Sequence, residues 1–418
     1  MNVTKSGNKM KVFIPIVVYL VSIAVFSYAK VVKIHVLSTL AGIFALIFLP
    51  GYGAREIIDS KIRGNSNIVL SFVMGHMIQL LNTFLAWILY ILFGGVNYEC
   101  LIIALSTFEV VLLSYLNSRL KSLIGENRWK KANIDKVFII LSLVYYILSI
   151  YWLSYVYEPN SDGAAYLDVA RNIVTRGKFE SNMVMPFSEW MNIQWKLGGD
   201  LSIHSFAIYN IALGFLITGE ISLLSAQVFL IFTGWLMMFI FYEFIKDLLG
   251  ANIARIATFL LVVHPETLAY TTLVGGPEVT SALYTFLSLF FILISQRSKD
   301  YNFFALLAGV SLFLSWYTWY YNFYVLLSFL GIYYMYLLNK HEKNRTKLSH
   351  VLISYFCLSL FVFEFKYLPL LIVEHLKFAI QIPIIFILSI VVLYLKNKKH
   401  VLQGLISFIV SLSIVSLM

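Results

Sequence analysis

The chain has 418 residues, of which 60% are hydrophobic and 12% are charged, and its formal net charge is +10. Soluble domains carry about twice that share of charged residues, so the composition excludes an ordinary soluble domain. In a membrane protein a positive balance reflects basic cytoplasmic loops, and it gives no reason to expect a nucleic-acid partner. The 2 cysteines exclude a disulfide framework and a four-cysteine metal site. Long apolar runs recur throughout, so we expect an all-α, polytopic helical membrane protein.

The hydropathy pattern predicts about thirteen transmembrane helices. The basic residues before the first apolar run are not followed by a small-residue cleavage site, so this run is interpreted as a span rather than a removed signal. The predicted spans are Val12–Ala29, Ile34–Pro50, Ile68–Phe93, Cys100–Leu116, Val137–Tyr157, Ile221–Ile245, Ala251–Val263, Val279–Ser295, Phe303–Tyr317, Tyr320–Leu338, Leu348–Leu368, Phe378–Leu395 and Val401–Leu417.

Charge and loop length divide the chain into four regions. Residues 1–120 hold the first four predicted spans and form an accessory module that could bind a partner subunit or shape a lipid groove. Residues 121–136 form a basic cytoplasmic linker. Residues 137–345 form a core that contains a long polar loop, 157–219, and residues 346–418 hold the C-terminal transmembrane helices.

The segment His204–Thr218 decides the topology. It is apolar but only about half a span long, so we expect an interfacial or re-entrant helix. With the N-terminus in the cytoplasm, this choice puts the Lys/Arg-rich loops inside, as the positive-inside bias requires, whereas a full span here would put the later ones outside. The sequence therefore predicts a multi-pass protein of the cell membrane with three segments outside the cytoplasm: loop 157–219, His264–Glu278 and the Trp316–Tyr321 turn.

The loop begins with a charged stretch, Tyr157–Phe179, that predicts a turn followed by an amphipathic helix in the membrane interface. Asp162 lies in the first turn of this helix, one helical step before Tyr166, whereas the spacing turns Asp168 away. A carboxylate at this place is a good helix cap, and it can equally serve in catalysis. The spacing leaves both interpretations open.

Several short motifs along the core then carry a resemblance. In chain order they are Asp162 with Tyr166, Ala170-Arg171-Asn172 and Gly177; His204 to Tyr209 with Phe215 and Gly219; Leu248 to Gly250; His264-Pro265 with Gly276-Pro277-Glu278; and Leu307 to Gly309. Over about residues 137–330 this order resembles the integral-membrane glycosyltransferases of the GT-C superfamily, in the branch of protein O-mannosyltransferases and aminoarabinose transferases.

The resemblance implies an inverting transferase that moves a sugar from a polyprenyl-phosphate donor to an extracytoplasmic lipid, protein or glycan acceptor. It implies Asp162 as the catalytic carboxylate. Because phosphate leaves as a stable anion, one carboxylate base and nearby cations are sufficient to catalyse the transfer. Glu278 is the candidate second catalytic acid, and the candidate substrate-binding residues are Glu158, Tyr166, Arg171, Lys196, His204 and His264.

No metal site is assigned, because no acidic or histidine pair has a spacing that demands one. A divalent ion stays open as an alternative, with Asp200 and His204 as the most suggestive spacing. The aromatic residues from Trp316 to Tyr324 are typical of an interfacial belt, and alternatively of a wall that stacks on sugar or prenyl groups.

Glu109 lies near the middle of a predicted span, where a charge is costly. His76, Gln79 and Thr83 lie at similar depth in the preceding span and predict a hydrogen-bonded pair that joins the hairpin, with a proton or ion path as the alternative. The rival functions are a transporter or lipid-linked-sugar flippase, a polysaccharide polymerase or ligase, and a non-catalytic assembly subunit. A transporter predicts several deep charges and an internal repeat, and neither is evident.

Overall fold

The computed structural model describes residues 3–62, 66–93, 97–124, 135–154, 161–176, 205–274 and 277–319. Every regular element in these ranges is a helix, and 7 helices there are long and apolar enough to cross a membrane. Each overlaps a predicted span, which confirms a helical membrane protein. Two more predicted spans are shorter apolar helices, Ala251–Val263 and Tyr301–Trp316. The predicted spans after residue 319 lie outside the described residues, so the total of about thirteen stays a prediction.

The chain divides into two compact units. The first comprises Met1–Leu287 with Leu314–Trp319, and the second comprises Ser288–Phe313 with Tyr320–Met418. The helices are α1 (Val3–Val31), α2 (His35–Gly42), η1 (Ile43–Phe48), α3 (Leu49–Ile62), α4 (Val69–Phe93), α5 (Tyr98–Ile124), α6 (Lys136–Leu153), α7 (Ser161–Arg176), α10 (Ser205–Thr218), α11 (Leu223–Leu249), α12 (Ala251–Val263), α13 (Pro265–Thr272), α14 (Glu278–Arg297) and α15 (Tyr301–Trp316).

The second membrane helix is longer than its predicted span. The elements α2, η1 and α3 run without a break from His35 to Ile62, a helical stretch of 28 residues. The predicted end at Pro50 is therefore wrong, because the helix continues through Pro50, the second residue of α3. A proline inside a membrane helix is tolerated where a local π-helical adjustment satisfies the freed backbone groups. The π-helical turn η1 comes directly before it. Consequently Arg55 and Asp59, predicted in a loop, are buried on α3 and paired at 3.5 Å between Nε and Oδ2.

Glycines let α3 and its π-helical turn touch α4 backbone to backbone. A Cβ added to Gly51 would meet the carbonyl oxygen of Ser71 and the backbone of Gly75, and a Cβ added to Gly75 would meet the carbonyl oxygen of Ile47. Small residues of this kind allow close approach of membrane helices, where dispersion contacts supply the attraction. These backbone contacts hold η1 and α3 against α4.

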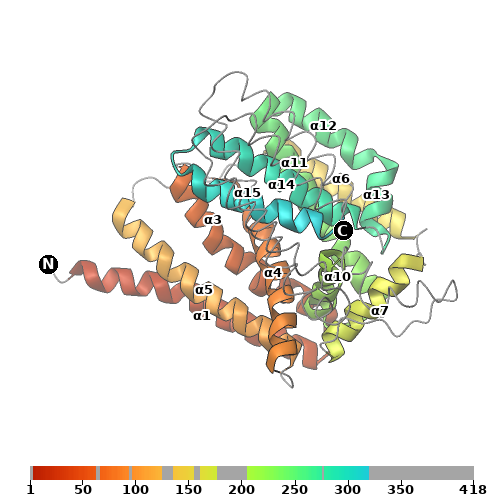
Figure 1. Ribbon diagram of the computed structural model, residues 1–418, viewed down its shortest axis with the longest axis horizontal. Helices are drawn as coiled ribbons and strands as arrows, with labels where there is room; N and C mark the ends of the chain where they lie inside the picture. Colours follow the sequence, from red (N-terminus) through yellow and green to blue (C-terminus); the bar gives the residue numbers. More distant parts are fainter. Residues whose placement is uncertain are drawn as a thin grey trace, which may run out of the picture. The chain divides into compact units, whose positions relative to one another are not determined.

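The short helix α10 is a buried element rather than an interfacial one. It packs against α2, α4, α7 and α11, and Figure 1 shows it between α4 and α7. Its side chains from Phe206 to Ile217 are buried with the polar Asn210 among them. The prediction of a half-length apolar helix that does not span is consistent with this placement.

Asn210 joins α10 to three membrane helices through a closed set of hydrogen bonds. Its Nδ2 donates to the hydroxyls of Thr233 at 3.2 Å and Thr280 at 3.1 Å, so its Oδ1 is left to accept from Nε2 of His76 at 2.8 Å. The other ring nitrogen of His76 then accepts from the hydroxyl of Tyr284 at 2.7 Å. All polar atoms of the imidazole and the amide have partners, as a buried network requires.

The hairpin of α4 and α5 is joined by polar pairs, as predicted, but with different partners. Asn82 Nδ2 donates to Glu109 Oε2 at 2.8 Å, and Gln79 Nε2 donates to Ser106 Oγ at 2.9 Å. His76 does not take part, because it faces α10 and α14. Spacing along α4 identified which of its polar residues share a similar depth. Which helix each one faces depends on how α4, α5, α10 and α14 pack together.

Asp135 joins α6, α11 and α12 at the end that is expected to face the cytoplasm. Its carboxylate caps α6 by accepting from the Val137 N–H at 2.9 Å, and Oδ2 also accepts from the Tyr242 hydroxyl and from Arg255 Nη2 at 2.9 Å. The Tyr242 hydrogen bond, with those from Val137 and Arg255, lowers the pKa of Asp135 below its usual 3.8.

The described part of the second unit is a helical hairpin. The later turns of α14 pack against α15, with Ser288 Oγ donating to the Ala308 carbonyl at 3.0 Å and the rings of Phe291 and Phe304 6.3 Å apart.

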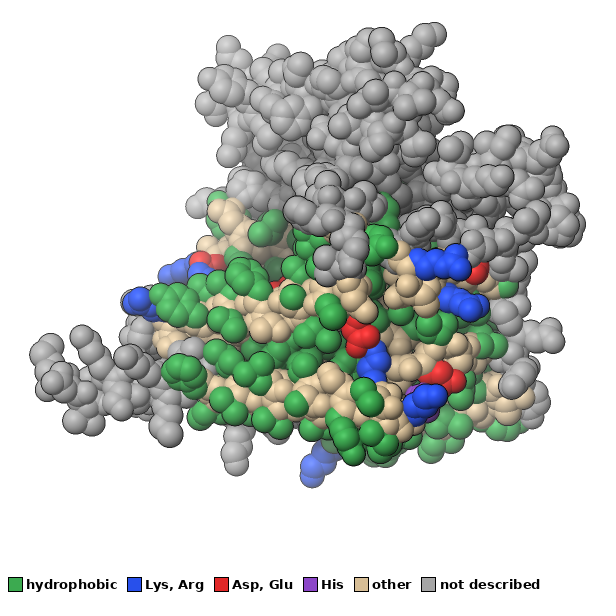
Figure 2. Space-filling view, turned by 90° about the horizontal axis from the view of Figure 1, so that it is seen from below, with side chains coloured by type: hydrophobic (Ala, Val, Ile, Leu, Met, Phe, Trp, Pro, Cys, Tyr) green, Lys and Arg blue, Asp and Glu red, His purple; other side chains and the backbone are tan. Residues whose placement is uncertain are grey.

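A lipid-compatible surface covers one face of the described part of the molecule. Figure 2 shows hydrophobic side chains predominating on this face, with a few acidic and basic side chains near its middle and others toward its edges. On α1 and α5 many large apolar side chains are exposed, among them Phe13, Val21, Phe108 and Tyr115. In water such a face would be unfavourable, so the bilayer is the solvent that fits it.

Candidate functional site

The helix α7 has the amphipathic pattern predicted for the extracytoplasmic loop, and it packs on protein. Its apolar side chains Tyr166, Val169 and Ile173 are buried, at 5%, 0% and 0% exposure. The helix packs mainly against α10 and also against α5, and Figure 1 shows α7 alongside α10. The apolar face therefore covers another helix of the first unit, where an interfacial helix would have buried it in lipid.

One polar residue, Asn172, lies on the buried side of α7. Asn172 is only 3% exposed, because it follows Val169 by three positions and so shares its side of the helix. Arg171 and Arg176 are exposed, and Asp168 is half-buried.

Position 162 is the second residue of α7, inside the helix rather than before it. At about 100° per residue, positions 166, 169 and 173 follow it on the same side of the helix, within about 40°. Those three positions are the buried ones. The backbone register therefore puts position 162 on the side of α7 that is directed at the protein interior.

The same register separates Asp162 from Arg171. Nine residues of α-helix correspond to about 13 Å of rise and about half a turn of rotation, so the two positions lie on opposite sides of α7. Arg171 is exposed. A cation that holds the phosphate of a donor next to Asp162 would therefore come from another segment.

Three separate segments meet at the beginning of α10. The Phe206 N–H donates to the Tyr317 carbonyl at 3.2 Å, which joins the beginning of α10 to the turn after α15. The hydroxyl of Ser281 donates to the carbonyls of Ser315 and Trp319, both at 3.2 Å, which joins the first turn of α14 to the same turn. Glu278 begins α14, one helical turn before Ser281, and is half-buried.

His264 and Glu266 lie at the start of α13, away from the hydrogen bonds that join α10, α14 and the turn after α15. Both are exposed at the start of α13, with Pro265 at the first helical position. This helix packs against α6, α11 and α12. Figure 1 draws α13 and α7 on the same side of the molecule. An acidic residue in a first helical turn also has a plain electrostatic reason, since it complements the helix dipole.

The remaining candidates have no described environment. Glu158, Lys196 and His204 lie outside the described residues, as does Asp200 of the suggested metal spacing, and Asp162 is described by its backbone alone. Within the described ranges, no group of three or more His, Cys, Asp and Glu side chains is arranged to hold a metal ion.

The described residues of the aromatic cluster from Trp316 to Tyr324 are buried or half-buried. Trp316 and Tyr317 are 5% and 3% exposed, so they fill the interior, and Trp319 is half-buried. Tyr320, Tyr321, Phe323 and Tyr324 lie outside the described residues.

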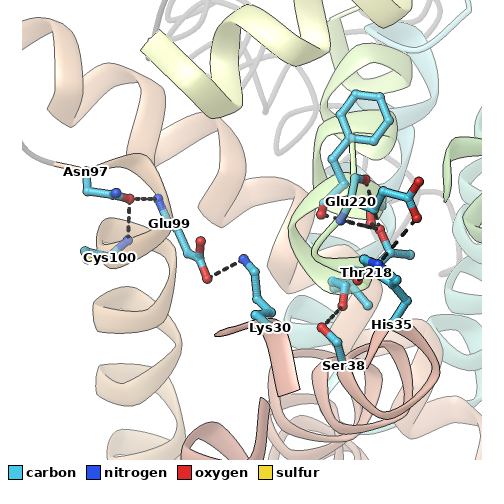
Figure 3. A network of polar contacts seen from close by, with 11 residues as sticks. Lys30, His35, Ser38, Asn97, Glu99, Cys100, Thr218 and Glu220 are labelled. Carbon is cyan, nitrogen blue, oxygen red and sulfur yellow. Dashed lines mark hydrogen bonds and ion pairs between the residues drawn. The ribbon is translucent and has the colours of Figure 1, made fainter. Parts of the chain in front are cut away.

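A polar network that the sequence did not indicate surrounds the other end of α10. Lys30 Nζ donates to Glu99 Oε1 at 2.6 Å, Ser38 Oγ donates to the Ile217 carbonyl at 3.1 Å, and His35 Nδ1 lies 3.8 Å from Glu220 Oε2. Figure 3 shows Lys30 pointing toward Glu99 and His35 pointing toward Glu220. The network ties the turn between α1 and α2 to the end of α10, and thus helps to hold the helix on which α7 rests.

Asn210 is the buried polar residue that sequence reasoning missed. It is 0% exposed and holds α10 through the His76 network. The available signal was a single amide inside an otherwise apolar helix, which is expensive in a membrane protein unless it has partners.

No protein-family model, curated protein or solved structure matches this chain.

Proposed function

We propose that this membrane protein is a glycosyltransferase that moves a sugar from a polyprenyl-phosphate donor to an acceptor outside the cytoplasm, with Asp162 as the base. The observation that supports it most is the register of α7, which puts position 162 on the same side of the helix as the buried Tyr166 and Val169. The exposed Arg171, by contrast, lies on the opposite side of the helix from position 162.

In the proposed reaction the acceptor hydroxyl oxygen bonds to the anomeric carbon of the sugar while the bond from that carbon to the phosphate oxygen breaks. The Asp162 carboxylate takes the hydroxyl proton. The bonding electrons leave with polyprenyl phosphate, and the configuration at the anomeric carbon inverts. Phosphate needs no proton to leave, so the second carboxyl of a glycosidase is unnecessary.

The leaving phosphate needs a positive partner to offset its charge. Arg171 lies on the opposite side of α7 from position 162, so it suits a lipid headgroup better than the reacting phosphate. Of the predicted candidates this leaves Lys196 as the cation to test first.

Glu278 is proposed to position the acceptor. It begins α14 one turn before Ser281, which is bonded to the turn after α15, and that turn is bonded to the start of α10. Since α10 packs against α7, a series of contacts connects Glu278 with the helix of Asp162.

The test uses full-length protein in proteoliposomes with radiolabelled short-chain polyprenyl-phosphate mannose, glucose and aminoarabinose as donors and a membrane extract as acceptor. We expect Asp162→Asn to reduce sugar transfer by at least about a hundredfold, the range for loss of a general base.

Asp168→Asn is the matched control, because Asp168 lies on the same helix, is half-buried and is turned away from position 162. It should retain transfer. Wild-type levels of transfer by well-folded Asp162→Asn protein would refute the catalytic role.

A transporter is the second candidate, and one observation favours it. Arg55, Glu56 and Asp59 are buried within an apolar spanning helix, at 7%, 5% and 5% exposure, and intramembrane charges often mark transport pathways. The same proteoliposomes distinguish the two functions. A transporter would move the labelled donor across the bilayer without forming a glycosidic product, and Asp162→Asn would leave that movement unchanged.

A further inference from the structure

We infer that Glu109 is a proton-binding site inside the bilayer, carried as the neutral acid and reached from the lipid. This inference concerns a side chain of α5 and its surroundings, and it does not depend on the proposed transferase activity.

The first argument is position. Glu109 lies midway along the apolar stretch Tyr98–Arg119 of α5, eleven residues after its start and ten before its end. A helix rises about 1.5 Å per residue, so the carboxyl lies about 15 Å from either end of that stretch. This is about half the thickness of the hydrocarbon core, so the carboxyl belongs near the bilayer midplane.

The second argument is that Glu109 is not fully enclosed. It is half-buried, and its neighbours Phe108 and Leu112 are 65% and 41% exposed. One oxygen, Oε2, accepts from Asn82 Nδ2 at 2.8 Å, and within the described residues Oε1 has no hydrogen bond. The carboxyl therefore lies at the seam between α4 and the exposed side of α5.

The third argument is the absence of a cation. From α4 the carboxyl faces the neutral amide of Asn82, and the His76 ring of that helix is engaged with Asn210 and Tyr284. From α1 it faces Tyr19, whose hydroxyl accepts from Thr107 at 3.3 Å. Among the described residues no Lys, Arg or His forms an ion pair with Glu109.

The charged residues of the other helices packed on α5 are placed elsewhere. Gly53 of α3 lies against Leu113, and its carbonyl accepts from Asn117, so the charges that follow it on α3, at Arg55, Glu56 and Asp59, lie beyond the depth of Glu109. The helix α7 contributes Asp168, Arg171 and Arg176, none of which is ion-paired with it.

These facts select the protonated form. An unpaired carboxylate near the bilayer midplane is unfavourable by several kcal/mol, whereas a neutral acid can accept from Asn82 and keep its own proton. The protein therefore offers lipid-soluble reagents a carboxylic acid, and it binds or releases a proton at this place.

Dicyclohexylcarbodiimide tests the inference, because it partitions into membranes and reacts with carboxylic acids. The acid proton goes to one carbodiimide nitrogen while the carboxyl oxygen bonds to the central carbon. The acyl group then migrates to nitrogen and gives a stable N-acylurea, with no leaving group. Wild-type protein in proteoliposomes is treated near neutral pH, digested, and the modified peptide is identified by mass spectrometry.

We expect labelling of Glu109 at least about tenfold above that of Glu99. Glu99 is the matched control, because it lies in the first turn of the same helix and is ion-paired with Lys30. A water-soluble carbodiimide that carries a quaternary ammonium group should not label Glu109, and labelling should decline as the pH rises. Lack of reaction at Glu109, or equal reaction with the water-soluble reagent, would overturn the inference. Neither outcome bears on sugar transfer, and the assay needs no variant protein.

Discussion

At the scale of single residues, a few polar side chains determine where apolar helices meet. Hydrocarbon chains are as apolar as leucine, so the burial of apolar surface cannot by itself choose one helix neighbour over another inside the bilayer. Hydrogen bonds can. The amide of Asn210 accepts from His76 of α4 and donates to Thr233 of α11 and Thr280 of α14, and so defines the neighbours of α10.

Asp135 likewise joins three helices through hydrogen bonds at one of their ends, and this role can be tested by substitution. Asp135→Ala removes the cap of α6 and the partner of Arg255 and Tyr242. We expect a loss of about 1 kcal/mol, the usual cost of losing an N-cap. The measurement is thermal unfolding in detergent. Asp135→Asn should lose less, because an asparagine oxygen still caps the helix.

The pH dependence of this contribution follows from the lowered pKa of Asp135. The stabilisation by the carboxylate is complete above the usual pKa of 3.8, where the unfolded residue is also ionised, and is lost as the pH falls through the lower folded pKa. The difference in Tm between wild type and Asp135→Asn should therefore shrink below about pH 4. A difference that stays constant down to acid pH would contradict the assignment.

At the scale of elements, small residues and helical register determine what each helix presents. Gly51 and Gly75 let η1, α3 and α4 touch through their backbones. In α7 the register directs positions 162, 166 and 169 to one side, so the helix can pack on α10 and still carry an acid on that side.

The glycine contact predicts a large effect for a small change. Gly75→Ala places a methyl group against the Ile47 carbonyl, and no side-chain rotation can relieve a contact between backbones. We expect a loss of about 3 kcal/mol, at the upper end for overpacking, and a lower yield of monodisperse protein in size-exclusion chromatography.

Ala104→Leu is the matched control for this prediction. Ala104 is exposed on α5, so a larger side chain there enters free space. Equal stability of the two variants would show that the close approach of η1 and α4 is not needed.

At the scale of the whole molecule, the membrane character is shown, and the direction of insertion is a prediction. The polar segments that contain positions 161 and 275 should lie on one side of the membrane, with the basic linker 121–136 on the other. Single cysteines at Ser161, Gly275 and Lys131 test this in a background in which Cys100 and Cys357 are replaced by serine. A membrane-impermeant maleimide added to intact cells should label the first two and spare the third. Labelling of Ser161 and Gly275 from opposite sides would exclude a common site.

The class of protein and most helix positions could be predicted from the amino-acid sequence. Runs of apolar residues report directly on transfer into lipid, so the spans that became α4, α5, α11 and α14 were predictable. It also identified the short apolar helix that became α10 and the amphipathic pattern of α7, since both are local properties of the chain. It misplaced the end of the second span, because Pro50 and the charges after it are also typical of a loop.

Which helices these elements contact depends on the packing of the folded chain. Arg55 and Asp59 are tolerated inside a span because they pair with each other, and Glu109 is held by Asn82 rather than by His76. Hydropathy cannot supply such partners, because it sums residues along one helix, whereas a hydrogen bond depends on the rotation and depth of two. The same distinction applies to position 162. That it shares a side of the helix with Tyr166 could be predicted from the spacing. That this side of α7 rests on another buried helix, rather than on lipid, follows from packing alone.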